Sequence, residues 1–313
     1  MASRPQIVTA LSTTSQATST DSAHVGSSLA QIALYRLRRD KLTLLALAVL
    51  VTLALLSVLA PVISQYVLGV DPNTTDGYNH MLPIAAPGHI LGTDNLGRDQ
   101  LSRLLFAGQV SLGIAFVGAI LSIGIGLFLG VLTGYYGGPL DDFVTWVIAT
   151  LNSIPGLFLL LIVSAVLKPG PGALIVVLGL LGWTFTTRLV RGETFALRER
   201  DFIIGAKAVG APDRYIMFAH IVPNVISITV VNLAITIGDL ILLESALSFL
   251  GVGIQPPTPT WGNMLSNAQA FFKTGGHLVI FPGLLIVVTV LCLYIIGDGV
   301  RDAFDPTLKY GSR

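Results

Sequence analysis

Long stretches without a charged side chain are the feature that most restricts what this chain can fold into. A helix needs about 20 apolar residues to cross the hydrocarbon core of a bilayer, and six uncharged runs reach or nearly reach that length. These runs are 42–70, 104–140, 143–167, 169–187, 215–238 and 274–297. The run 104–140 is too short for two full spans with a loop, so we expect one span inside it. The sequence therefore predicts an all-α polytopic membrane protein with six transmembrane helices.

The remaining composition agrees with a membrane protein. Only 11% of the residues are charged, against about 25% in ordinary soluble chains. A seventh uncharged run, 245–272, is interrupted by Pro256, Pro257 and Pro259, so we expect a loop or a re-entrant hairpin there. The net charge of +1 comes without a basic patch interleaved with aromatic residues, which argues against nucleic acid as a partner. Membrane lipid is the expected surrounding.

The distribution of Lys and Arg predicts the orientation in the membrane. With the N-terminus in the cytosol, only four of the 18 Lys and Arg residues fall outside, namely Arg98, Arg103, Lys168 and Lys273. Positive charge is retained on the cytosolic side of membrane proteins. We therefore expect a multi-pass protein of the cytoplasmic membrane with both termini in the cytosol.

The spans and charges divide the chain into expected regions. Residues 1–40, rich in Ser and Thr, are a flexible cytosolic tail followed by a lead-in helix from Gln31 to Lys41. The transmembrane domain covers 41–310, and 311–313 form a C-terminal tail. The main loops of the transmembrane domain are an external loop 71–105, a cytosolic loop 188–222 and an external Pro-rich loop 251–277. The single cysteine, Cys292, lies in the last span, so no disulfide forms within the chain.

The charged segment between the fourth and fifth runs predicts two short helices joined by a turn. Gly210 suits the left-handed residue that closes a helix, and Pro212 suits the first turn of the next helix. A short loop would suffice to reconnect two spans. Such an elbow in the cytosol instead indicates a docking surface for a partner.

The fifth span carries two carboxyl groups, which are costly in hydrocarbon and by default indicate a functional site. At about 100° per residue, Thr229, Asn232, Thr236 and Asp239 share one stripe of the helix. This stripe is expected to line a translocation path or a subunit interface. Asp239 is equally compatible with a hydrogen-bonded carboxyl that fixes the helix register. Glu244 lies off the stripe near the external end, where an interfacial carboxylate is favoured over contact with cargo.

Small residues at four-residue spacing mark the second span. Gly118, Ser122, Gly126, Gly130 and Gly134 fall on one helical face, and such faces let membrane helices approach closely. Tight packing is the favoured interpretation, and a sliding contact during conformational change is compatible with it.

The external loop is predicted to contain a short amphipathic helix, Thr93–Phe106, whose start Thr93 or Asp94 can cap. Its leucines, Leu101, Leu104 and Leu105, are expected on the bundle, and Arg98, Asp99 and Ser102 toward solvent. The helix either seals the outer mouth or, with the Pro-rich loop Gln255–Trp261, receives an external protein. The residues expected in this gate or contact are Asp94, Arg98, Asp99 and Trp261.

The sequence lacks the common motifs for nucleotide binding, metal binding and nucleophilic catalysis. The sequence has no G-x-x-x-x-G-K-[ST] phosphate loop, no His pair with metal spacing and no G-x-S-x-G nucleophile elbow. We therefore expect a non-catalytic chain without a metal site.

Four segments resemble the second membrane subunit of the dipeptide/oligopeptide ABC importers. They read LGTDNLGRDQLSRLLFAGQVSL (91–112), DFIIGAKAVGAPDRYIMFAHIVPN (201–224), LSFLGVGIQPPTPTWGNML (247–265) and GDGVRDAFDPTLK (297–309). The resemblance extends over roughly residues 30–310. It implies the fold of a type I ABC importer permease, with 201–222 as the loop that couples transport to ATPases. The coupling residues are then Asp201, Ala206, Gly210, Ala211, Pro212 and Pro223.

The resemblance also implies partners and cargo. They are a second, related permease subunit, two cytosolic ATPases that bind ATP and Mg, an external substrate-binding protein and a short peptide. One departure concerns the coupling loop, which in this family usually opens with Glu-Ala-Ala. Here Ile204, Gly205 and Ala206 stand in its place, so the role of the missing acid is dispensable or falls to Glu199 or Asp201.

Three alternatives remain open from the sequence. One is a purely structural assembly subunit that makes no contact with the cargo. The same class of permease carries other solutes, such as an oligosaccharide or a nickel complex. An ion-coupled secondary transporter would use Asp239 as its coupling site, but the sequence lacks the internal symmetry that this class often has.

Overall fold

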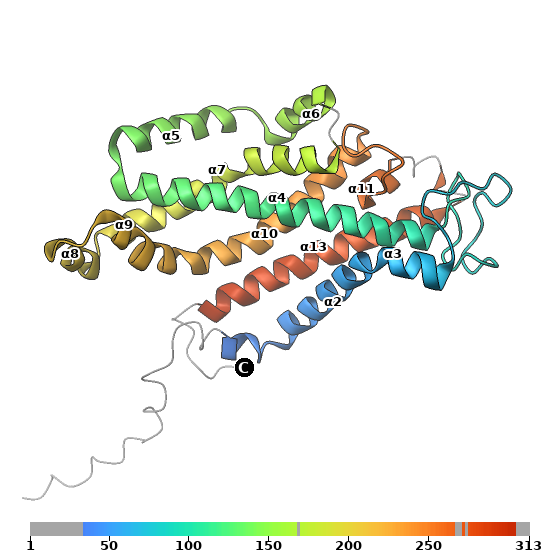
Figure 1. Ribbon diagram of the computed structural model, residues 1–313, viewed down its shortest axis with the longest axis horizontal. Helices are drawn as coiled ribbons and strands as arrows, with labels where there is room; N and C mark the ends of the chain where they lie inside the picture. Colours follow the sequence, from blue (N-terminus) through green and yellow to red (C-terminus); the bar gives the residue numbers. More distant parts are fainter. Residues whose placement is uncertain (1–33, 168–169, 267–270, 273–274, 305–313) are drawn as a thin grey trace, which may run out of the picture.

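A computed structural model describes residues 34–167, 170–266, 271–272 and 275–304, which form helices and no strand (Figure 1). The helices run in the order α2 (Lys41–Val58), α3 (Ala60–Val62), η1 (Ile63–Leu68), α4 (Gln100–Tyr136), α5 (Gly138–Asn152), α6 (Gly156–Leu167), α7 (Pro171–Arg198), α8 (Asp201–Ala208), α9 (Asp213–Tyr215), η2 (Ile216–Ile221), α10 (Val222–Phe249), α11 (Trp261–Met264) and α13 (Gly276–Phe304).

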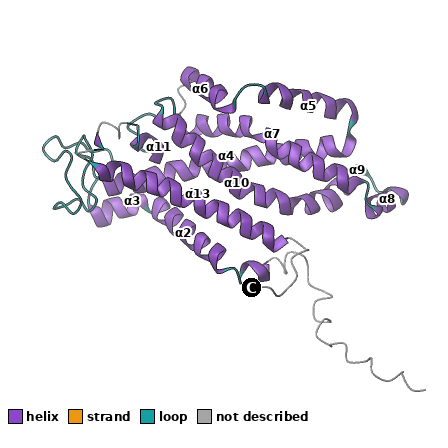
Figure 2. Cartoon of the chain, turned by 180° about the vertical axis from the view of Figure 1, so that it is seen from behind, coloured by secondary structure: helices purple, strands orange, loops and turns teal. Residues whose placement is uncertain are grey.

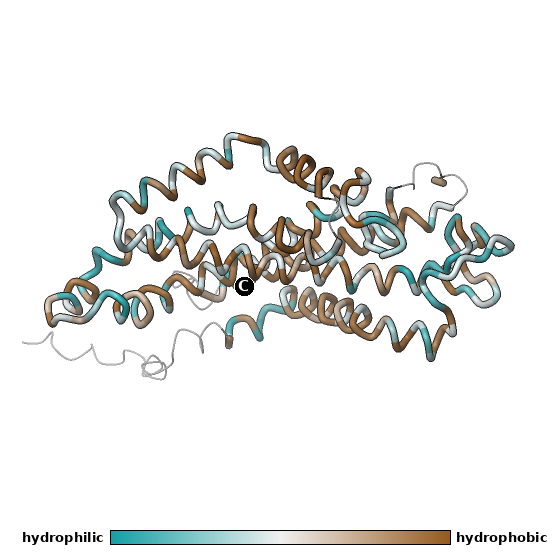
Figure 3. Tube along the Cα trace, turned by 45° about the horizontal axis from the view of Figure 1, so that its top comes forward, coloured by the Kyte–Doolittle hydropathy of each residue, from teal (hydrophilic) through white to brown (hydrophobic). Residues whose placement is uncertain are grey.

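The long helices lie lengthwise beside one another, so the bundle has two distinct ends (Figures 1 and 2). One end holds the short helices α8 and α9, and the start of α2 and the end of α13 point toward it. The loop between η1 and α4 and the short helix α11 occupy the opposite end. Figure 3 shows hydrophobic colour along the long helices and hydrophilic segments gathered at both ends. This distribution suits a bundle that crosses a membrane.

In the part of the chain that the structure describes, five helical segments are long and apolar enough to cross a membrane, and they correspond to five of the six uncharged runs. The third run differs from the expected single span, because it forms two helices, α5 and α6, bent by 80° at the break. Pro155 lies at this break, and a proline disfavours helical conformation in the residue before it. If the bent pair counts as one span, the bundle has six.

The small-residue face of α4 packs against α7, as the sequence predicts. A Cβ atom on Gly126 would lie 2.5 Å from the Cβ of Thr186, and one on Gly134 would lie 2.5 Å from the Cβ of Thr194. Only glycine allows the two backbones to approach this closely. The sliding contact stays a prediction.

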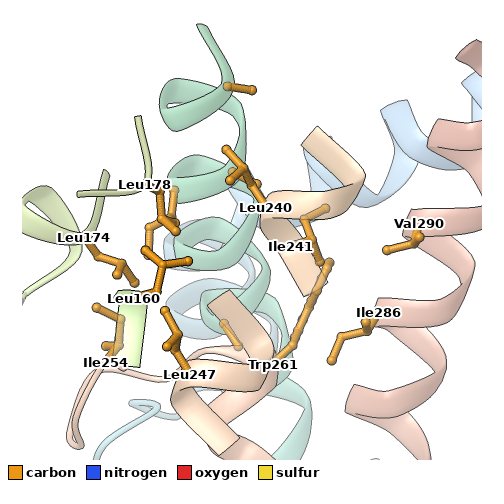
Figure 4. Close-up of a cluster of buried hydrophobic side chains, with 14 of the residues drawn as sticks. Leu160, Leu174, Leu178, Leu240, Ile241, Leu247, Ile254, Trp261, Ile286 and Val290 are labelled. Carbon is orange, nitrogen blue, oxygen red and sulfur yellow. The ribbon is translucent and has the colours of Figure 1, made fainter. Parts of the chain in front are cut away.

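Buried apolar side chains form two clusters along the bundle. The larger one lies toward the end that holds α11 and joins α4, α7, α10 and α13 with Trp261 of the Pro-rich loop (Figure 4). The smaller one lies beside α8 and contains Val131 and Tyr135 of α4 with Ile203 and Ile216. Large apolar side chains such as Phe128 and Trp146 are exposed on the outside of the bundle, where lipid or a partner would cover them.

The start of α4 corrects the expected external helix. The helix begins at Gln100, not at Thr93, because Asp99 is its N-cap and accepts a hydrogen bond from the Ser102 N–H at 2.7 Å. Asp99 and Ser102 are buried, so the expectation that they face solvent was wrong. Leu104 packs in the core as predicted. The external loop therefore ends at residue 99 instead of 105.

The loop that the sequence analysis expects in the cytosol also starts later than expected. Helix α7 continues through Arg188 to Arg198, so only the part from residue 199 connects α7 to α10. Of the expected N-terminal region, the structure describes residues 34–40, which include a helical turn at 34–37 and Asp40 as the N-cap of α2. The segment expected to be a flexible tail and the C-terminal residues 311–313 lie outside the described residues.

Candidate functional site

The turn between α8 and α9 has the geometry that Gly210 and Pro212 predict. Gly210 has a φ of +82°, in the left-handed region. Its N–H donates to the Lys207 carbonyl, and the Ala211 N–H donates to the Ala206 carbonyl, each at 3.0 Å. This pair of bonds is a Schellman motif, which ends a helix and turns the chain. Pro212 follows as the N-cap of α9.

Residues 201–221 are called the elbow below. The inner face of the elbow is fixed to the bundle. Ile203, Ile216 and Ile221 are fully buried in the smaller cluster. The Tyr135 hydroxyl of α4 donates to the Asp213 carboxylate at 2.6 Å, and the Lys207 ammonium lies 5.0 Å from the centre of the Tyr135 ring. A force on the elbow therefore acts directly on α4.

The outer side of the elbow is open and carries several large apolar side chains. These are Phe202, Ile204, Val209, Tyr215 and Phe218, of which Val209 is 85% exposed, and charged residues such as Arg214 are exposed among them. These residues follow one another around a turn that is anchored on its other side. The elbow thus presents exposed apolar side chains on a segment that is anchored to the bundle.

The expected coupling residues all lie on or next to this elbow. Asp201, Gly210, Pro212 and Pro223 are exposed, whereas Ala206 and Ala211 are half-buried beside the smaller cluster. Of the two candidates for the missing acid, Glu199 pairs with Arg198 at 3.0 Å, and Asp201 lies in the first turn of α8. A carboxylate in a first turn is favourably placed toward the helix dipole, so Asp201 also suits the start of α8.

An ion pair joins α5 to α7 close to the elbow. The Arg191 guanidinium donates through Nε and Nη2 to the two oxygens of Asp141, the second bond at 2.5 Å. Paired planar groups of this kind hold a defined geometry. Sequence reasoning placed Arg191 among the loop charges and missed its partner, because the two residues lie 50 positions apart.

The polar stripe of α10 does not face a single environment. Thr229 and Asn232 are buried, and the Asn232 amide donates to the Thr186 hydroxyl of α7 at 2.9 Å. Thr236 is half-buried, whereas Asp239 is exposed and accepts a hydrogen bond from the Tyr294 hydroxyl of α13 at 2.8 Å. The helical spacing of these four residues correctly places them on one face of α10. The helices that pack against α10 decide which part of that face is buried.

Glu244 is fully buried, so its expected place at the interface was wrong. The Ser111 hydroxyl of α4 donates to its Oε2 at 3.0 Å, and the Ser248 hydroxyl donates to its Oε1 at 2.8 Å. The Pro-rich loop covers this carboxyl. The Trp261 N–H donates to the Ser111 hydroxyl at 3.2 Å, and the Ile254 N–H donates to the Ser248 hydroxyl at 3.2 Å.

The residues expected at an external contact are mostly inside the protein. Asp94 and Asp99 are buried, and Trp261 is 1% exposed, with its indole N–H donating to the Leu104 carbonyl at 3.2 Å. Arg98 pairs with Asp94 at 2.7 Å, whereas Asp99 pairs with His89 at 2.9 Å. In this conformation Arg98 is the member of the set with the most accessible surface.

A cavity of about 440 Å³ lies where α5 and α6 separate. Pro155, Leu160 and Leu240 contribute apolar walls, and Asn152 and Arg188 contribute polar groups. Arg188 is exposed, and no ion pair to it occurs among the described residues. The sequence did not indicate this cavity, because the helix break that creates it falls inside an uncharged run. Within the described residues, no cluster of His, Cys, Asp and Glu has the arrangement of a metal site.

Comparisons with known proteins agree on one class. The family model described as "binding-protein-dependent transport system inner membrane component" matches residues 126–310, and that of the "N-terminal TM domain of oligopeptide transport permease C" matches residues 28–83.

Three curated relatives cover most of the chain. The dipeptide transport system permease protein DppC of Haemophilus influenzae is 35% identical over 87% of this chain and 92% of its own length. The oligopeptide transport system permease protein OppC of the same organism is 34% identical over 90% and 89%. The glutathione transport system permease protein GsiD of Pectobacterium atrosepticum is 37% identical over 79% and 82%. A solved chain of the MetNI methionine ABC transporter in an inward-facing conformation is 24% identical, covers 62% of this chain and 93% of that chain, and has a TM-score of 0.49.

Proposed function

Because the chain belongs to the family of inner membrane components of binding-protein-dependent transport systems, we propose that it is a transmembrane subunit of an ATP-driven importer for short peptides. The single observation that carries the peptide cargo is the relatedness to three permeases named for a dipeptide, an oligopeptide and glutathione. All three are peptide cargoes. The related classes that carry an oligosaccharide or a nickel complex are therefore less favoured.

The elbow supports coupling to ATPases outside this chain. Its exposed apolar face, with Val209 and Phe218, offers a surface for a cytosolic ATPase. Its inner face is fixed to α4 through Tyr135 and Asp213. Closure of two ATPases on ATP and Mg would move the docked elbow as a rigid body, and the attached helices would follow. The chain itself supplies the mechanical connection, and its partners supply the energy.

The proposed assembly has parts on both sides of the membrane. The N- and C-termini and the elbow lie in the cytosol, and the external loop and α11 lie outside, where a binding protein delivers the peptide. A second, related permease subunit completes the translocation path. In this chain, the cavity beside Arg188 and the exposed carboxyl of Asp239 are the polar surfaces available for that path.

The proposal is tested by peptide uptake in cells that carry the complete transporter. We expect uptake of a labelled dipeptide to require ATP and to be lost when this chain is deleted. The same cells are offered a labelled oligosaccharide and a nickel complex. Uptake of one of those cargoes without uptake of any peptide would overturn the peptide assignment.

The ion-coupled alternative is tested at Asp239. In an ATP-driven importer, Asp239→Asn keeps an oxygen that accepts the Tyr294 hydrogen bond, so we expect uptake to change less than about threefold. Uptake that collapses both in this variant and when the proton gradient is dissipated at constant ATP would instead identify Asp239 as a coupling site.

A further inference from the structure

A small cavity of about 90 Å³ lies at the external end of the bundle, apart from the elbow and from the cavity at the helix break. The external loop contributes Asp94 and Arg98 to its wall, and the first turn of α4 contributes Gln100 and Arg103. Asn263 of α11 closes it from the Pro-rich loop. At about 30 Å³ for each water molecule, the space is large enough for a few waters or one small ion.

The charges around this cavity do not balance. Asp94 is shared between two guanidinium groups, with its Oδ2 at 2.7 Å from Arg98 Nε and at 3.6 Å from Arg103 Nε. The Asp94 Oδ1 is occupied by the N–H groups of Leu96 and Arg98 at 2.8 and 3.0 Å. Two cations therefore face one anion, which leaves one positive charge in excess.

Burial makes this excess charge costly. Arg103 is only 4% exposed, and its neutral partners are the Pro72 carbonyl at 3.0 Å and the Asn73 amide oxygen at 3.4 Å. Burial of a charge without full compensation is unfavourable. An additional anion beside Arg103 would remove the imbalance.

A second, independent observation concerns Gln100. Its side chain lines the same cavity and is 1% exposed, yet its Nε2 has no hydrogen-bond partner among the described residues. A buried N–H donor without an acceptor is uncommon in native proteins, and each one calls for a specific explanation. The unpaired Gln100 donor and the excess positive charge of the two arginines therefore border the same cavity.

We propose that this cavity binds one small monovalent anion, of the size of a carboxylate group or a halide ion. Gln100 Nε2 and the guanidinium groups of Arg98 and Arg103 donate to it. The anion is a shared partner of the external loop, α4 and the Pro-rich loop. It therefore stabilises the contact between these three segments, which together form the external cap of the bundle. Its source is either the external medium or an acidic side chain of the binding protein, and only the second source rests on the proposed function.

The test measures thermal unfolding of the full-length chain in nanodiscs with its co-purifying subunits. Acetate and chloride are titrated separately at constant ionic strength, maintained with gluconate, whose polyol chain is too large for the cavity. We expect a saturable rise in Tm with acetate or chloride. Gln100→Leu removes a donor that is unpaired in the empty cavity, so it should fold, and its apparent affinity for the anion should fall about tenfold.

Two controls make the result specific. Gln65→Leu changes an exposed glutamine at the same end of the bundle, so it should keep the wild-type response. Arg98→Gln removes one cation from the cavity and should weaken the response as Gln100→Leu does. A wild-type Tm that follows acetate and chloride no more than gluconate would overturn the site, and so would equal loss of response in Gln65→Leu.

Association of the binding protein distinguishes the two sources. If its carboxylate fills the cavity, acetate competes with association, and Gln100→Leu weakens it. If the anion comes from the medium, association is unchanged while the Tm response persists. An absent response with normal peptide uptake rejects the anion site alone, whereas an intact response without peptide uptake rejects the proposed function alone.

Discussion

At the scale of single residues, polar groups buried at the end of the bundle that holds α11 connect segments that are distant in sequence. Glu244 accepts hydrogen bonds from Ser111 and Ser248, and the same two serines accept backbone N–H groups from the Pro-rich loop. The carboxyl thus organises the hydroxyls that hold the loop. Sequence reasoning recognised Glu244 as unusual but not its burial, because the loop that covers it follows in the chain and Ser111 lies 133 positions before it.

The first prediction concerns this carboxyl. Glu244→Ala leaves two buried hydroxyls without their acceptor and creates a cavity, so we expect a loss of stability of about 2–4 kcal/mol. Glu244→Gln keeps one acceptor oxygen and should lose about 1 kcal/mol. Unfolding is followed by tryptophan fluorescence, to which the buried Trp261 contributes. The control, Glu193→Ala, removes an exposed carboxylate and should change little, and an equally stable Glu244→Ala would contradict the role.

At the scale of helices, local signals predicted the elements and distant contacts decided their ends. Gly210 and Pro212 act within a few residues, so the elbow could be predicted. The end of α7 could not be predicted. Lys and Arg residues indicate where the chain leaves the membrane, but a helix can continue beyond that point. Arg191 remains helical and pairs with Asp141 of α5. The break at Pro155 shows the opposite case, in which an uninterrupted apolar run contains two helices.

The second prediction concerns the contact of α4 with α7. A Cβ on Gly130 would lie 2.7 Å from the Cβ of Val190 and 2.9 Å from the Thr187 carbonyl oxygen. Gly130→Ala should therefore destabilise the bundle by about 1–3 kcal/mol. Gly124 lies on the same helix, and a Cβ there would meet no neighbouring element within 4 Å, so Gly124→Ala should be neutral or stabilising by up to about 1 kcal/mol. Equal unfolding temperatures of the two variants would remove the packing argument.

At the scale of the whole molecule, each end of the bundle carries its own exposed surface. The elbow carries exposed apolar side chains, and the external loop carries Tyr78, which is almost fully exposed. The two surfaces lie at opposite ends of the bundle (Figure 1). They are therefore suited to a labelling test of orientation.

The third prediction concerns docking at the elbow. Val209→Asp places a charge on an open apolar surface, so we expect peptide-stimulated ATP hydrolysis of the assembled transporter to fall about tenfold. The stability of the chain should change by less than about 0.5 kcal/mol, since surface substitutions generally do so. Val209→Ala shortens the same side chain but keeps the surface apolar, so it should preserve hydrolysis. Normal hydrolysis in Val209→Asp would exclude this face as the ATPase contact.

The fourth prediction concerns orientation. Single cysteines replace Tyr78 or Val209 after Cys292, which is buried, is changed to Ser. A membrane-impermeant thiol reagent added to intact cells should label position 78 and should label position 209 only after the membrane is opened. The reverse pattern would invert the proposed topology.

The unbroken length of α4 has a mechanical consequence for both ends. With 37 residues and a rise of about 1.5 Å for each residue, the helix is about 55 Å long. It begins beside the external cap at Asp99 and ends beside the elbow at Tyr135. A stiff rod of that length works as a lever arm, so a tilt of only about 5° shifts its far end by about 5 Å. In the proposed importer, a small displacement of the elbow would therefore produce a shift of several ångströms at the opposite end of the bundle.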